Sequence, residues 1–70
     1  MEPFDLCGRE FVELSNLLKL TGIRSSGGSA KMAVAAGLVT VDDQVELRKR
    51  CKIRPGRIVA CDGRQIVVRA

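Results

Sequence analysis

The spacing of apolar residues changes near position 38, and this change constrains the fold more than any other feature of the sequence. Before it, Leu14, Leu17 and Leu18 follow the i, i+3, i+4 spacing of one helical face. After it, Val39 and Val41 alternate with other residues, as in a strand that is buried on one side. Because helices precede strands, the sequence predicts an α+β fold with two short N-terminal helices packed on a small sheet.

The two helices should be short and closely packed. The first is predicted over residues 14–21 and ends before Gly22, which can adopt the left-handed conformation that closes many helices. The second is predicted over residues 29–36, where alanine is frequent, with Ser26 or Ser29 as its cap. Small residues on one face of this helix allow a close approach, so we expect the pair to form a helical corner.

The second half of the chain should form a mainly antiparallel sheet of hairpins. Asp42-Asp43 is a possible hairpin turn, although it is a weaker turn sequence than Asn-Gly. Pro55-Gly56 marks a second turn. Asp62-Gly63 is the strongest hairpin signal, because it separates two alternating segments, 57–61 and 64–69.

The length and composition indicate one folded domain over residues 1–70. Seventy residues supply one small core and no second one. A hydrophobic content of 46% excludes disorder. No apolar run approaches the ~20 residues of a membrane span, and the start of the chain lacks the features of a signal peptide. We therefore expect a cytoplasmic protein with no membrane association.

The cysteines do not form a recognisable metal or disulfide pattern. Cys7, Cys51 and Cys61 are an odd number without a C-x-x-C pair, and the chain has no histidine. We expect three buried free thiols and no metal. A Cys51–Cys61 disulfide between neighbouring strands is geometrically allowed, but a reducing compartment disfavours it.

Residues 45–54 combine strand alternation with a run of positive charge. Odd positions in this segment are mostly apolar, and even positions are charged, which predicts a strand held to the core by Val45, Leu47, Cys51 and Ile53. Lys49 breaks the alternation, so the chain should bulge or leave the sheet near it.

The positive charge of this segment can be explained in two ways. It can be a solvated outer face, or it can be a surface that binds an anion. A solvated face normally mixes both signs, whereas residues 48–54 carry five positive side chains and no negative one. Residues 24–57 carry a net charge of +5, from eight basic and three acidic residues, which favours an anionic partner such as nucleic acid.

The start of the second helix is a second candidate anion site. Lys31 is predicted in the first turn, where the helix dipole disfavours a cation by a few tenths to ~1 kcal/mol. Arg24 precedes that turn, and Gly27-Gly28 would leave backbone amides open to a phosphate. The alternative is that the residues from Ser26 to Gly28 form only a turn and a helix cap, and the sequence does not decide between the two.

The residue types that are missing narrow the function further. Phe4 and Phe11 are the only aromatic residues, which disfavours binding of single strands by base stacking. Contacts should therefore be made to the phosphates and sugars of a structured nucleic acid. The sequence offers no nucleophile with a base nearby and no pair of catalytic carboxylates, so we expect no enzyme activity and no cofactor.

Four segments in series resemble a known family: LSNLLKLTGI, SSGGSAKMAVAAGLVTVDD, VELRKRCKIRPG and RIVACDG. Together they resemble the RNA-binding domain first described in small-subunit ribosomal protein four, which contains the αL motif, in the stand-alone form of the bacterial YbcJ-like proteins. The resemblance covers about residues 11–68. It implies two helices on a small sheet, with structured RNA bound by the start of the second helix and the following β-loop. The family usually has Asn-Gly at the positions of Asp42-Asp43, which makes this turn a doubtful RNA contact.

The sequence therefore predicts non-catalytic binding of structured RNA, either ribosomal or transfer RNA, by a monomer that could also contact ribosomal or RNA-processing proteins. The RNA-binding residues are predicted to be Arg24, Ser26, Lys31, Arg48, Lys49, Arg50, Lys52 and Arg54. The main alternative is a protein-interaction adaptor whose basic face meets an acidic partner. A DNA-binding module ranks third, because the sequence has no element that reads bases.

Overall fold

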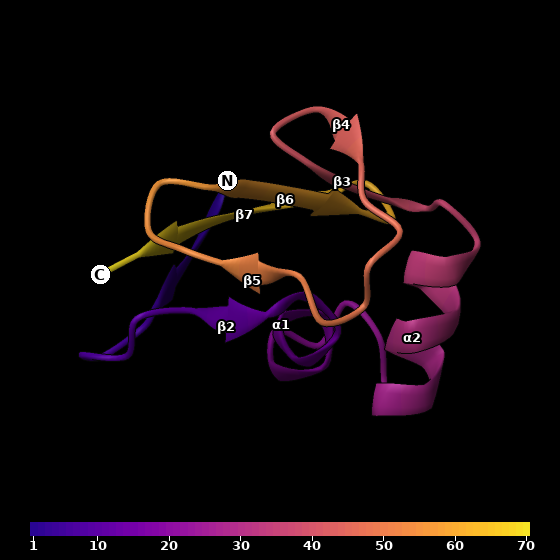
Figure 1. The fold of residues 1–70 in the computed structure, drawn as a ribbon, viewed down its shortest axis with the longest axis horizontal. Helices are drawn as coiled ribbons and strands as arrows, with labels where there is room; N and C mark the ends of the chain where they lie inside the picture. The colour runs from indigo at the N-terminus through magenta and orange to yellow at the C-terminus, as the bar shows by residue number, and fades with distance from the viewer.

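The protein has two helices and seven short strands in the order ββααβββββ (Figure 1). The structure is a computed structural model that describes residues 1–70. The predicted α+β class with a mainly antiparallel sheet is confirmed. The elements are β1 (Glu2–Asp5), β2 (Val12–Glu13), α1 (Leu14–Leu20), α2 (Gly27–Ala35), β3 (Val39–Val41), β4 (Gln44–Val45), β5 (Lys52–Ile53), β6 (Ile58–Cys61) and β7 (Arg64–Arg69).

The strands form two separate sheets. The larger sheet has the order β1-β7-β6-β3-β4, and only the β1–β7 pair is parallel. The smaller one is the antiparallel pair of β2 and β5, which lie side by side in Figure 1. Neither β1 nor β2 was anticipated from the sequence. Their pairing partners lie at least 39 residues away, as in Val12 opposite Ile53 and Glu13 opposite Lys52, so no local pattern reveals them.

The first helix forms where it was predicted, and the second begins earlier. Gly22 follows α1 with φ +77°, the left-handed conformation expected of a residue that closes a helix. Ser26 is the cap of α2, and its hydroxyl accepts a hydrogen bond from the amide of Ser29 at 3.1 Å. Because the helix starts at Gly27, Lys31 is its fifth residue, and the prediction that it lies in the first turn was wrong.

Side chains from both helices and both sheets form one core. Leu14, Leu17 and Leu18 contribute from α1, and Ala30, Ala33 and Val34 contribute from α2. The larger sheet adds one face of β3, β6 and β7, and Ile53 adds the apolar side of β5. The small residues of α2 let the two helices pack against one another.

Both predicted Asp-containing hairpin turns are present. Asp42 and Asp43 have φ of +51° and +67°, the left-handed pair of a type I′ turn, and they connect β3 to β4. The Asp42 carboxylate accepts hydrogen bonds from the amide of Ile58 at 3.0 Å and from Arg57 at 2.6 Å. Asp42 therefore fastens this turn to the start of β6. Asp62 and Gly63 form a similar turn between β6 and β7.

The strand predicted over residues 45–54, with a bulge or departure from the sheet near Lys49, breaks earlier than expected, directly after Val45. The chain leaves the larger sheet after Val45 and forms a loop. It joins the smaller sheet at Lys52, as β5. Val45 and Leu47 are 59% and 62% exposed, so they do not hold this segment to the core. Ile53 is buried, as expected, whereas Cys51 is only half-buried. Alternation predicted the apolar side correctly only where β5 has a partner strand.

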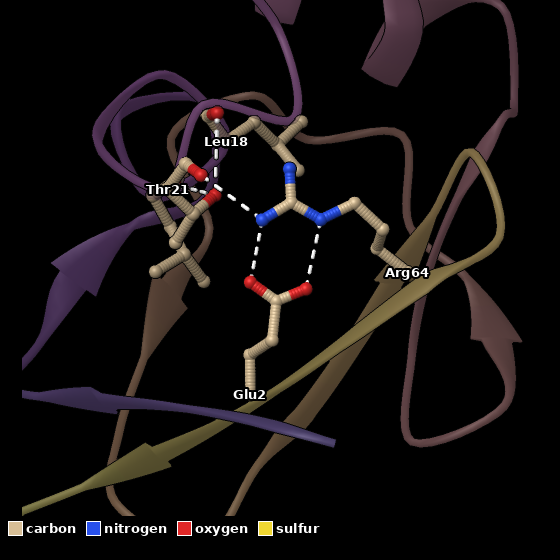
Figure 2. A network of polar contacts seen from close by, with 5 residues as sticks. Glu2, Leu18, Thr21 and Arg64 are labelled. Carbon is tan, nitrogen blue, oxygen red and sulfur yellow. Dashed lines mark hydrogen bonds and ion pairs between the residues drawn. The ribbon is translucent and has the colours of Figure 1, made fainter.

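An arginine network joins the N-terminal strand to the end of α1 (Figure 2). The Arg64 guanidinium, on β7, binds the Glu2 carboxylate of β1 through two hydrogen bonds, with Nε at 2.8 Å from Oε2. It also donates a hydrogen bond to the carbonyl oxygen of Thr21 at 3.2 Å. The Thr21 hydroxyl in turn donates to the carbonyl of Leu17 at 2.8 Å. This network fixes the larger sheet against the helices.

All three cysteines are free, as predicted, but they are not all buried. Cys61 is buried, Cys51 is half-buried and Cys7 is exposed. Cys7 lies in the turn after β1, where its φ is +54°. Neither helix has the length and apolar character that crossing a bilayer would require.

Candidate nucleic-acid interface

The positively charged segment is a loop that is held against the start of α1. We call residues 46–51, between β4 and β5, the basic loop. Its carbonyl oxygens accept hydrogen bonds from the first amides of α1: Leu14 donates to Cys51 at 2.9 Å, and Ser15 donates to Lys49 at 3.0 Å. Glu13 supplies no side-chain cap to this helix, so the loop takes over that role. Figure 1 shows the loop reaching down to α1.

The pairing of β2 with β5 holds the other end of the loop. Lys52, which directly follows the last loop residue, lies opposite Glu13. Ile53 lies opposite Val12. Since both anchors are backbone hydrogen bonds to segments that are buried in the core, the loop has a defined position. Its exposed side chains are therefore presented from a fixed support.

Arg48 is largely neutralised by a neighbour. Its Nε and Nη2 atoms each lie 3.0 Å from a carboxylate oxygen of Glu46, and its backbone amide donates to the same carboxylate at 3.0 Å. These hydrogen bonds lower the pKa of Glu46 from 4.5 to about 2. The pair carries no net charge at neutral pH, although the Arg48 side chain remains 76% exposed.

Arg50 and Arg24 also have carboxylate partners. Arg50 Nε lies 3.2 Å from the Glu13 carboxylate, and both groups are open to solvent. Arg24 Nε lies 3.0 Å from the carboxylate of Asp62 in the β6–β7 turn, and its Nη1 lies 3.5 Å from the Ser29 hydroxyl. The structure thus directs Arg24 toward the β6–β7 turn.

The lysines, unlike most of the arginines, are not paired with carboxylates. All six ion pairs in the structure use an arginine, and none uses a lysine. Lys31, Lys49 and Lys52 are exposed and have no carboxylate partner, and the same holds for Arg54. These four predicted site residues carry uncompensated positive charge on the surface.

Phe11 positions two of these cations. The Lys52 ammonium lies 5.0 Å from the centroid of the Phe11 ring, and the Arg54 guanidinium carbon lies 5.6 Å from it. Both distances are within the range of a cation–π interaction. The ring is thereby covered by cations, so it is not a free platform for a base.

Two hollows flank the point where the basic loop meets α1. The first is lined by Arg48, Arg50, Cys51 and Lys52. The second lies between α1 and the start of α2 and is lined by Glu13, Ser15, Asn16, Lys19, Gly27 and Lys31. The hollows are neighbours, because Arg50, which lines the first, is paired at 3.2 Å with Glu13, which lines the second.

The structure adds residues that sequence reasoning missed. Lys19 lines the second hollow beside Lys31, in the place that Arg24 was expected to fill. Its position was available from the sequence, because Ser15, Asn16 and Lys19 share the polar side of the helix whose apolar side is leucine. Ser26, which was predicted as an RNA contact, has its hydroxyl oxygen engaged as the cap of α2.

Comparisons with known proteins agree with this geometry. A family model described as an S4 domain matches residues 4–69. The chain is 49% identical over 68 residues to "Putative RNA-binding protein YbcJ" of Escherichia coli (strain K12), with 97% of each chain covered. It has the same identity and coverage with "Uncharacterized protein YbcJ" of Shigella flexneri.

A solved structure is similar over the whole chain. The solution structure of YbcJ from E. coli, which is described as revealing an αL motif involved in RNA binding, superposes with a TM-score of 0.77 at 48% identity. The match covers 100% of this chain and 89% of that one. Sequence and fold therefore point to the same family.

Proposed function

The chain belongs to the S4 domain family, and we propose on that basis that it binds structured RNA through phosphate contacts and catalyses no reaction. The relative named as an RNA-binding protein and the solved structure with an RNA-binding motif support RNA as the ligand. The protein would act as a monomer on a folded RNA such as ribosomal or transfer RNA.

One observation carries the proposal. Exposed cations without carboxylate partners lie on or beside a loop whose backbone is hydrogen-bonded to α1. Lys49, Lys52 and Arg54 have no carboxylate within ion-pair distance, and the loop backbone beside them is hydrogen-bonded to α1. Like charges held close together repel one another, and an anion removes that repulsion. RNA phosphates supply such anions at regular spacing.

The same surface favours folded RNA over a flexible single strand. Sequence-tolerant binding of single strands depends on aromatic rings that stack on bases. The single aromatic ring beside the basic loop, Phe11, is covered by Lys52 and Arg54. Contacts made only to phosphate and sugar recognise the shape of a structured RNA.

A matched pair of double variants tests this proposal. Lys49→Gln/Lys52→Gln removes two unpaired cations beside α1, and Arg9→Gln/Arg69→Gln removes the same charge elsewhere, next to Phe4 and Asp5. Affinity for a ribosomal RNA hairpin is measured by fluorescence anisotropy, and circular dichroism verifies folding. The first variant should lose about a hundredfold in affinity, on about 1.5 kcal/mol for each of its two charged contacts, and the control should lose much less. Equal losses would mean that only net charge matters.

A second candidate function, an adaptor for an acidic protein, is favoured by exposed apolar residues beside the basic loop. Val45 and Leu47 are more than half exposed, and both lie over Gly37 at the end of α2. An apolar patch next to cations is typical of a protein interface. A pull-down before and after nuclease treatment separates the two functions. Partners that remain after the RNA is removed support the adaptor.

A further inference from the structure

One border of the larger sheet is unprotected. The sheet ends in β1 on one side and in β4 on the other (Figure 1). Proteins commonly protect such borders with proline or charge, because an unpaired strand can pair with another chain. β1 has both, since Pro3 has no amide hydrogen and Glu2 and Asp5 are charged. β4 has neither, because its two residues are Gln44 and Val45.

The backbone of Val45 is free to pair with a further strand. In the β3–β4 hairpin, Val45 lies opposite Thr40, and the next amide, that of Glu46, donates to the carbonyl oxygen of Val39 at 3.1 Å. Backbone groups of successive residues point to opposite sides of a strand, so the amide and carbonyl of Val45 point away from β3. Leu47 lies outside the strands and makes no backbone–backbone hydrogen bond. This short stretch therefore offers unpaired donors and acceptors.

The same stretch exposes two large apolar side chains on one face. Val45 is 59% exposed and Leu47 is 62% exposed. Both side chains lie over Gly37, within 3.9 Å of the position that a Cβ atom would take there. Leu38, which follows this glycine, is also exposed. A strand added to β4 would cover these side chains with apolar side chains of its own.

The charge beside β4 favours an acidic partner over a second copy of the chain. A hollow next to the strand is lined by three cations, Arg48, Lys52 and Arg57, and by one carboxylate, that of Glu46. Residues 44–54 carry a net charge of +4, from five basic residues and one acidic residue. Two copies paired through β4 would bring these charges together, and like charges repel. An acidic segment would instead be attracted to the same place.

We propose that β4 binds an extended, acidic segment of another protein by adding it to the larger sheet as a further strand. Backbone hydrogen bonds to Val45 and Leu47 hold the segment, and its apolar side chains pack on these two residues. Glu46 and Arg48 alternate with them along the chain and line the hollow, so the segment's carboxylates face the cations there. The proposal goes beyond RNA binding and does not depend on it. It gives the adaptor candidate a defined docking edge.

A peptide titration with one matched pair of variants tests this proposal. The probe is a short synthetic peptide of alternating valine and glutamate, and amide resonances of the whole chain are followed by NMR. Saturable shifts should be largest at Val45 and Leu47. Leu47→Ser should weaken peptide binding about tenfold, because less apolar surface is buried in the complex. Leu20→Ser, which removes a similarly exposed leucine from α1, should bind like the wild type. Thermal unfolding verifies that both variants are folded.

Several results would overturn the proposal. Equal binding of a peptide with lysine in place of glutamate would mean that the partner need not be acidic. Shifts at β1 in place of β4 would move the docking edge to the opposite border, and the absence of saturable shifts would eliminate it. Sedimentation of the chain alone tests for a second copy, because a dimer that Leu47→Ser dissociates would replace the acidic partner. The proposed RNA binding stands in each case, since it depends on Lys49 and Lys52.

Discussion

Lysines and arginines of the basic loop should contribute unequally to RNA binding, although both are exposed. Lys49 has no carboxylate partner, whereas Arg48 is bound by Glu46 through three hydrogen bonds. We compare Lys49→Gln with the double variant Glu46→Gln/Arg48→Gln, which removes the ion pair and leaves the net charge of the protein unchanged. A cation that is already neutralised releases few counterions from RNA, so the double variant should behave almost like the wild type.

The magnitude follows from the number of unpaired cations on the proposed surface. Five side chains qualify, namely Lys19, Lys31, Lys49, Lys52 and Arg54. If each contacts one phosphate at about −0.7 to −0.9 per contact, log affinity should fall with log salt at a slope of about −3.5 to −4.5. Lys49→Gln should make this slope shallower by about 0.7–0.9, and removal of the ion pair should change it by less than half as much.

The assay is fluorescence anisotropy of a labelled hairpin RNA at several salt concentrations between about 50 and 200 mM, the range in which counterion release dominates affinity. Circular dichroism verifies that both variants are folded. An equal change of slope in the two variants would mean that Arg48 exchanges Glu46 for a phosphate, which would refute the reasoning from internal pairing. A slope near zero in the wild type would remove the electrostatic account altogether.

Three further predictions concern the folded protein. Asp43→Gly should stabilise it by about 0.5–1 kcal/mol in urea denaturation, because glycine tolerates the φ of +67° at this turn position. Unchanged or lower stability would contradict this. The Glu46 carboxyl should titrate near pH 2 by NMR and return toward 4.5 in Arg48→Ala, so its stabilising effect is complete above pH 4.5 and is lost as pH falls through about 2. An unchanged pKa in the variant would rule out the pairing. Cys7 should react with iodoacetamide before Cys51, since it is exposed while burial raises the pKa of the Cys51 thiol, and the reverse order would contradict the placement of the two thiols.

Local signals in the sequence predicted the helices and turns well. The leucine spacing of α1, the closing Gly22 and the Asp62-Gly63 turn depend on neighbouring residues only, and each appears in the structure. The N-terminal strands were missed because their partners lie far along the chain. The exposure of Val45 was missed for a related reason. Val45 is paired with Thr40 of β3, but β4 is the outermost strand of the larger sheet, so its apolar side chain lies beyond the core.

The candidate site was predicted in outline but not in its electrostatics. The run of basic residues and the parity break at Lys49 identified a segment that does leave the sheet. A sequence cannot show that Glu13 reaches Arg50, because these residues are 37 positions apart and meet only when β2 pairs with β5. Lys19 was missed because only the apolar side of its helix gives a strong periodic signal in the sequence.

The most direct test of the central claim is a map of RNA contacts on the whole chain. Backbone amide shifts of the labelled protein are followed by NMR. An unlabelled, structured ribosomal RNA hairpin is added until the protein is saturated. The account predicts that the largest shifts cluster in the basic loop, at Lys52 to Arg54, and at the facing starts of α1 and α2. Shifts concentrated on β1, β6 and β7, or spread evenly over the surface, would contradict it.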